Sequence, residues 1–488
     1  MEERKGFGTN FGFLMASVGS AVGLGNIWGF PNKMGASGGF TFLIVYLVLA
    51  VLCGFIVMVG ELALGRKTGK GVVSAYQALS KRFKWVGWLG ILSPFFILFF
   101  YCALGGYCIK YTVLNIGDLF HAGFGANALA ETAVANGHSL GAEVFGAFMS
   151  SPTEAIIFGL IFVALTMLIV MGGVSGGIEK VCSVGMPALF VMLLICIIRA
   201  CTLEGAVDGL KYMFVPGWAV TNGVIDKAPN FFGVLSAAGG QMFFSLSLGM
   251  GIMITYGSYL DKKENLQKNA LLIIIMDTLV ALMAGLCVIP GRFALDPTGS
   301  LGGPKLLFVT MQNVFSRMGP IGPIFGILFY LLVVFAAISS SISLLEAVVA
   351  HFVDNARDAG KGDKRKAYAL IAAVAVGVGA MLICADSLGE ASFTPWRLLN
   401  LPAESIRTWN DCWLDFFDML SEGIMMPLGA LMMTLMVGWE LGPDVVKDEC
   451  EASGHAMASY GFYKVCIKYI TPLCMILVLY GQIKEFFF

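Results

Sequence analysis

Charged residues are scarce in this chain. They make up 13% of its 488 residues, whereas hydrophobic residues make up 58% and the mean hydropathy is +0.82. This composition excludes a water-soluble globular protein and predicts a protein that crosses a lipid bilayer many times. The net charge is -1, so no excess of positive charge predicts nucleic acid as a partner.

Catalytic and metal-binding patterns are also lacking. The 12 Cys show no CxxC pairing, and the four His are scattered, at His121, His138, His351 and His455. No Ser with a paired His lies in an apolar segment and HExxH is absent, so we do not expect an enzyme. A channel would need repeated pore loops or rings of charge, which are missing as well.

Long apolar segments are what the sequence has instead. A helix needs about 20 apolar residues to cross the hydrocarbon core. On that criterion we predict about eleven transmembrane helices, at residues 9–34, 40–64, 87–116, 154–172, 178–201, 229–258, 266–291, 320–354, 366–385, 412–439 and 460–483. Lys and Arg cluster in alternate loops, and the loop at 117–153 has none. Because basic loops stay in the cytoplasm, we expect the N-terminus there and the C-terminus outside.

Two of these segments do not resemble plain spans. The first contains ASVGSAVGLGNIWGFP and the sixth contains GGQMFFSLSLGMG, and both are rich in Gly. Helices broken at corresponding positions of two five-helix halves are typical of transporters, because the break frees backbone groups to bind ions and substrate. Close packing of helices through small residues is the alternative. Asn26, Ser20, Gln241 and Ser245 at mid-membrane depth favour a binding site, because polar groups there are costly.

These segments carry a family resemblance. GSAVGLGNIWGFP, GQMFFSLSLGMG and FAAISSSISLLE resemble motifs of the neurotransmitter:sodium symporter family, over about residues 4 to 480. The resemblance implies an all-α membrane protein of the leucine-transporter type, a 5+5 inverted repeat with helices 1 and 6 broken at mid-membrane. The expected boundaries are a cytoplasmic N-terminus (1–8), a first repeat (9–201), an extracellular loop (202–228), a second repeat (229–439), a cytoplasmic loop (440–459) and helix 11 with the C-terminus (460–488).

The resemblance also implies two sodium ions next to the substrate. For the first ion the matching residues are Ala21, Asn26, Ser245 and Asp277. For the second they are Gly19, Val22, Ala336, Ser339 and Ser340. A hard cation such as Na⁺ prefers oxygen ligands, and a broken helix exposes carbonyls. The serine run has an alternative role in helix packing.

Asp277 is the clearest ionisable residue within a predicted span. A carboxylate in hydrocarbon is expensive, so it should face a cavity or a cation. Many members of the family have an amide at this position and require chloride. We therefore expect transport that does not require chloride, and a proton-coupling carboxylate is the alternative.

The expected substrate is a small neutral amino acid. The resemblance places its carboxylate at the amides of Leu24 and Gly25 and at Tyr101. The residues that would bind or surround the substrate are Ala21, Leu24, Gly25, Ile97, Tyr101, Phe244, Ser245, Ser247, Met250, Ser340, Ser343 and Leu344. Amine transporters of the family have an Asp where this chain has Gly23, so biogenic amines are disfavoured.

The resemblance also assigns gates. An inner pair would join Arg4 and Asp354 with Tyr259 nearby. The outer mouth lacks the family's ion pair, so it would close by Tyr101 against Phe244 or by an unidentified partner. Gly177 and Pro187 match a site where the fifth helix unwinds. Gly29 departs from the family, which has an Arg there that pairs with an acid of the tenth helix. Asp415 and Asp418 would be the acids, but no such pair can form with Gly29.

The predicted function is sodium-coupled symport by alternating access, in a bacterial inner membrane. Two further functions stay open from the residues alone. One is proton-coupled transport of amino acids, and the other is a non-transporting amino-acid sensor on the same fold.

Overall fold

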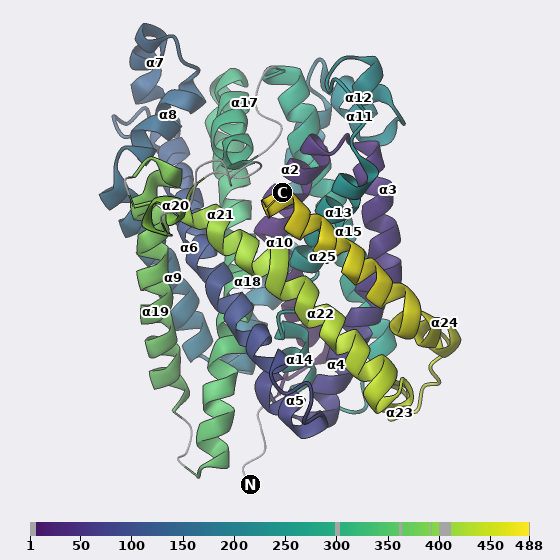
Figure 1. Cartoon of the computed structure of the whole chain (residues 1–488). Helices are drawn as coiled ribbons and strands as arrows, with labels where there is room; N and C mark the ends of the chain where they lie inside the picture. The colour runs from purple at the N-terminus through teal and green to yellow at the C-terminus, as the bar shows by residue number, and fades with distance from the viewer. Residues whose placement is uncertain (1–5, 298–302, 361–363, 392, 400–410, 488) are drawn as a thin grey trace.

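The computed structural model describes residues 6–297, 303–360, 364–391, 393–399 and 411–487. These residues form helices, and the described part of the chain has no strand. The helices stand side by side as a bundle (Figure 1). α5 (Val72–Leu79) lies at one end of the bundle, and α7 (Ala130–Asn136) and α8 (Leu140–Met149) lie at the other end. The predicted all-α fold is confirmed.

Nine helices of the described residues are long and apolar enough to cross a membrane. They are Phe40–Thr68, Val86–Leu119, Pro152–Met171, Val174–Cys201, Leu266–Leu295, Gly319–Asp358, Arg365–Gly389, Trp413–Leu441 and Tyr460–Lys484. Asn10–Ala21 and Gly25–Ala36 form a tenth span that is bent by 45°. The two helices within the expected sixth span are each too short to count, so the number eleven and the boundaries of the repeats stay predictions.

The labels of Figure 1 divide these spans into segments. The α-helical segments are α1 (Asn10–Ala21), α2 (Phe30–Ala36), α3 (Phe40–Leu49), α4 (Phe55–Thr68), α6 (Val86–Leu119), α9 (Pro152–Met171), α10 (Glu179–Cys201), α13 (Phe231–Ser245), α14 (Ile252–Gly257), α15 (Leu266–Leu295), α18 (Gly322–Asp358), α19 (Arg365–Asp386), α21 (Trp413–Asp418), α22 (Met426–Leu435), α24 (Tyr460–Val465) and α25 (Thr471–Phe487). π-Helical turns continue several of them, at η1 (Gly25–Gly29), η2 (Ala50–Gly54), η4 (Val174–Ile178), η9 (Met419–Met425), η10 (Met436–Leu441) and η11 (Cys466–Ile470). Shorter helices outside the spans include α11 (Ala206–Phe214), α12 (Trp218–Thr221), α16 (Gly303–Lys305), α17 (Met311–Arg317), α20 (Pro395–Leu399) and α23 (Asp444–Glu451).

Two breaks interrupt the bundle at the positions expected from the sequence. The first separates α1 from η1, and the second, at residues 246–251, separates α13 from α14. Ser247, Gly249 and Gly251 have φ values of +54°, +75° and +72° in the second break. Gly adopts this left-handed region at little cost, which explains why the apolar run LGMG stops being helical. The predicted breaks in helices 1 and 6 are thus present.

The helix α6 lies at the centre of the bundle. In its most apolar window 78% of the residues are buried, compared with 33% for α9 and 28% for Val174–Cys201. The helix α18 packs along α6 for much of its length, whereas α10 leaves apolar side chains such as Val184 and Ile198 exposed. In a membrane, such faces contact lipid. The first half of the broken first helix, α1, packs against α10, α18 and α15.

The contact between α6 and α9 depends on two Gly residues. A Cβ added at Gly106 would lie 2.5 Å from the backbone nitrogen of Gly159 and 2.6 Å from its Cα. Small residues of this kind allow membrane helices to approach closely. We predict that Gly106→Ala destabilises the protein by about 1 to 3 kcal/mol through overpacking. The measurement is the thermal unfolding midpoint in detergent, and the control is Gly185→Ala on α10, where no atom lies within 4 Å of the added Cβ. Equal effects of the two variants would contradict this interpretation.

Candidate functional site

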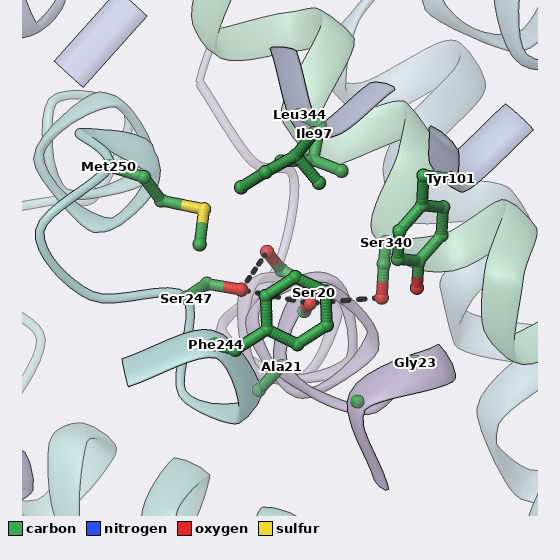
Figure 2. A pocket seen from close by; sticks show the side chains of 11 residues that line it. Ser20, Ala21, Gly23, Ile97, Tyr101, Phe244, Ser247, Met250, Ser340 and Leu344 are labelled. Carbon is green, nitrogen blue, oxygen red and sulfur yellow. Dashed lines mark hydrogen bonds between the residues drawn. The ribbon is translucent and has the colours of Figure 1, made fainter. Parts of the chain in front are cut away.

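A small cavity lies where the two breaks meet. It is lined by Ser20, Ala21, Gly23, Gly25, Ile97, Tyr101, Phe244, Ser247, Met250, Ser340 and Leu344. Figure 2 shows Ile97, Leu344 and Met250 across the cavity from Ala21 and Gly23. Its volume is about 20 Å³, on the scale of a single water molecule. The side chains around the two breaks therefore lie close together, with the Tyr101 and Phe244 ring centroids 6.4 Å apart.

Asp277 is the centre of a polar cluster on one side of the cavity. Its side chain is fully buried, and Asn26 donates a hydrogen bond to its Oδ1 atom at 2.7 Å. Ser245 donates to both carboxylate oxygens, at 3.0 and 2.9 Å, and Tyr46 donates at 3.3 Å. None of these described donors is positively charged. The carboxylate therefore suits a bound cation, which would balance its charge.

A second cluster of oxygens lies on the other side of the first break. Ser340 donates to the carbonyls of Gly19 and Ser20 at 3.2 and 3.0 Å, and Ser339 donates to Ala336 at 2.9 Å. The Val22 carbonyl accepts from both serines at 3.4 Å. Carbonyl and hydroxyl oxygens are the ligands that a hard cation prefers. The structure thus brings together all five residues that match the second sodium site.

The helical segment that follows the first break begins next to the cavity, because Gly25 lines it. The backbone N–H of Leu24 donates to the hydroxyl of Tyr101 at 2.9 Å. Free N–H groups at a helix N-terminus bind carboxylates, because the helix dipole favours negative charge there. A Cβ at Gly23 would lie 2.2 Å from both the Tyr101 hydroxyl and Ser340 Oγ. The cavity therefore has no room for a side chain at position 23.

The remaining predicted residues lie close to this cavity or at the inner end of the protein. Ser245 bonds to Asp277, and the Ser343 hydroxyl lies 2.6 Å from that of Tyr256, so neither of them lines the cavity. Tyr101 and Phe244 face each other with ring centroids 6.4 Å apart. Asp354 accepts from the N–H of Gly71 at 2.8 Å, and Arg4 lies outside the described residues.

Sequence reasoning missed a buried ion pair at the start of α19. Glu346 of α18 is 0% exposed, pairs with Arg365 of α19 and accepts a hydrogen bond from Tyr259 at 2.7 Å. Arg365 also donates to the carbonyl of Val170 at 3.0 Å. Glu346 ends the FAAISSSISLLE motif, so a carboxylate in an apolar run was a signal that could have found it.

The start of α1 is tied to the start of α10. Glu179 accepts from the N–H of Gly8 at 2.8 Å and from the hydroxyl of Thr9 at 3.0 Å, and Thr9 caps the helix by accepting from Gly12. A carboxylate at a helix N-terminus is stabilised by the helix dipole. Glu179 directly follows the π-helical turn η4, which contains Gly177, so this contact joins the inner half of helix 1 to the irregular part of the fifth span.

Broken helices around an oxygen-lined, mid-bundle cavity define a secondary transporter, and comparisons with known proteins identify its family. The model of the Sodium:neurotransmitter symporter family matches residues 4–121 and 154–395. An uncharacterised sodium-dependent transporter of Bacillus subtilis, YhdH, is 31% identical over an alignment of 485 residues that covers 96% of this chain and 96% of YhdH. A second uncharacterised sodium-dependent transporter, MJ1319 of Methanocaldococcus jannaschii, is 29% identical to this chain. The alignment covers 91% of this chain and 84% of MJ1319.

A solved structure agrees with this assignment. The structure of MhsT in complex with L-phenylalanine has a TM-score of 0.81, 31% sequence identity and coverage of 98% of this chain and 100% of MhsT. The chain belongs to the sodium:neurotransmitter symporter family, and it is a sodium-dependent membrane transporter rather than an enzyme. The resemblance inferred from the motifs is confirmed.

The buried ion pair between Glu346 and Arg365 predicts a difference in stability. Arg365→Met leaves Glu346 as an unpaired buried charge, and we expect a loss of about 3 to 5 kcal/mol. The pair between Lys70 and Asp358 is the control, since these side chains are 44% and 60% exposed. Lys70→Met should change stability by less than about 1 kcal/mol. Thermal unfolding in detergent measures both, and equal shifts would contradict the prediction.

Proposed function

We propose that the protein couples the inward movement of sodium to the uptake of a small neutral amino acid by alternating access. The observation that supports this most is the position of the first break. Its carbonyls face the Ser339 and Ser340 hydroxyls, and Asn26, which follows the break, reaches Asp277. A substrate in the cavity would thus lie next to both clusters, so the binding of ions and substrate would stabilise the same arrangement of the broken helix.

The lining of the cavity supports a zwitterionic, uncharged substrate. None of its lining residues is charged, and Ile97, Met250 and Leu344 provide an apolar wall. The carboxylate would bind at the amides of Leu24 and Gly25 and at Tyr101, and the amine at backbone carbonyls. MhsT, which resembles this chain over its whole length, is described with bound L-phenylalanine. A neutral amino acid fits this set of groups.

Two sodium ions would be transported with the substrate. Ala21, Asn26, Ser245 and Asp277 would bind the first, and Gly19, Val22, Ala336, Ser339 and Ser340 the second. The charge of Asp277 next to the first ion would make chloride unnecessary. We place the N-terminus in the cytoplasm and the protein in a bacterial inner membrane, with Arg4, Asp354 and Tyr259 at the inner gate.

Uptake by purified protein in liposomes tests the function. With an inward sodium gradient, we expect labelled neutral amino acids, L-phenylalanine included, to accumulate. Asn26→Ala should abolish sodium-dependent binding, because Asn26 joins the first break to Asp277. Asn115→Ala is the control, since the Asn115 side chain bonds Gln312, away from the cavity. Accumulation driven by a proton gradient and not by sodium would favour proton coupling, and binding without accumulation would favour a sensor.

The role of Asp277 gives a separate prediction. Asp277→Asn removes the negative charge that we assign to the first sodium, so a mobile anion should become necessary. We expect uptake by this variant to rise about fivefold or more when chloride replaces gluconate, whereas the unsubstituted protein does not respond. Asp118→Asn changes a carboxylate at the end of α6 and serves as the control. A chloride response in the unsubstituted protein would contradict the assignment.

A further inference from the structure

An ion pair joins the outer half of the broken first helix to the tenth span. Lys33 of α2 pairs with Glu422 of η9, and their side chains are 24% and 9% exposed. We propose that this pair closes the outer entrance to the cavity, in the place where Gly29 leaves no charge. The proposal rests on the alternating access of the proposed function, because only such a cycle requires an entrance that opens and closes.

The structure explains why position 29 itself carries no side chain. A Cβ there would lie 2.8 Å from the Oε1 atom of Gln241, a fully buried residue of α13. The Nε2 atom of the same amide donates to the carbonyl of Gly25 at 2.6 Å. Gln241 therefore occupies the space next to Gly29, and it connects α13 to the start of η1. A charged side chain that closes the outer entrance to the cavity must therefore belong to a position other than 29.

Lys33 lies one helical turn beyond Gly29. Side chains on a helix lean towards its N-terminus, so Lys33 covers the turn that contains Gly29. Eight residues separate Lys33 from Gly25 at the cavity, a distance of roughly 12 Å along the helix axis. Lys33 thus lies about two helical turns from the cavity, and the long stem of its partly exposed side chain allows the ammonium group to reach towards it.

Glu422 lies where three helical elements meet. It belongs to η9, contacts Lys33 of α2 and approaches α13, since a Cβ at Gly240 would lie 2.9 Å from its Oε1 atom. Asp418 lies one turn earlier on the tenth span and interacts with both Lys33 and Glu422. The carboxylates thus belong to the tenth span and the ammonium group to the bent first helix, so a movement at the bend would separate the charges.

Because the pair between Lys33 and Glu422 is partly buried, it contributes more to the stability of the closed state than an exposed pair would. An exposed pair contributes little, because water screens it, whereas breaking a buried pair leaves an uncompensated charge. Water that enters an opened vestibule would solvate both charges and lower that cost. The pair can therefore favour the closed state and still separate, which a gate requires.

Hydrogen–deuterium exchange of the full-length protein in detergent tests this proposal. We expect Lys33→Met and Glu422→Gln to speed exchange in α2 by roughly tenfold, because a charge-assisted contact is lost. Exchange at the start of α1 should become slower, because opening the outer side favours closure of the inner side. A purely structural contact would loosen α2 without protecting α1. Lys33→Arg, and the charge swap of Lys33→Glu with Glu422→Lys, should restore slow exchange in α2.

A matched control is the pair between Lys110 of α6 and Glu154 of α9, which lies between two unbroken helices. Lys110→Met should leave the exchange of α2 unchanged. The proposal is overturned if α2 exchanges at the original rate in both Lys33→Met and Glu422→Gln, or if α1 gains no protection in them. It is also overturned if α2 of the charge-swapped variant exchanges as fast as α2 of the single variants, or if Lys110→Met speeds the exchange of α2 equally. The readout needs no transported substrate, so its outcome is independent of whether uptake of an amino acid is found.

Discussion

Backbone groups that lie in a membrane must be hydrogen-bonded, because lipid offers no partner. At the two breaks of this protein the helices no longer supply those bonds, and side chains do so instead. Ser339 and Ser340 donate to carbonyls of the first break, Tyr101 accepts from Leu24, and Gln241 donates to Gly25. At the second break the N–H of Gly249 donates to Glu61 at 2.8 Å. The polar residues of the cavity follow from this requirement, and the same groups are those that ions and substrate can bind.

Sequence patterns were sufficient to predict the features that depend on the chemistry of one residue and its neighbours in the chain. Gly249 and Gly251 indicated a break because Gly tolerates backbone angles that few other residues adopt. In the structure both have positive φ values. Asp277 indicated a cavity because a carboxylate in an apolar run needs a partner, and it lies fully buried with three donors around it. The ligand sets came from family motifs and not from spacing, since residues as distant as Asn26 and Asp277 meet only through the fold.

Pairs between distant segments could not be predicted in this way. Tyr46 reaches Asp277 across 231 positions, and Lys33 meets Glu422 across 389. In the sequence, Glu422 is one of several acids near the start of the tenth span, and nothing in its neighbours distinguishes it from Asp415 or Asp418. Which acid faces the first helix depends on the rotation of that span, and a π-helical turn changes the rotation locally. The family resemblance pointed to Asp415 and Asp418 as acids of a pair that Gly29 prevents, and the pair between Lys33 and Glu422 was not predicted.

The tight packing at Gly23 has a consequence for how this protein can evolve. A side chain of any kind at this position would collide with Tyr101 and Ser340, which also hold the two sides of the break. An acidic side chain at position 23 would require Tyr101 or Ser340 to move or to change as well. A change at position 23 is therefore coupled to changes at Tyr101 and Ser340, because all three residues share the same small space.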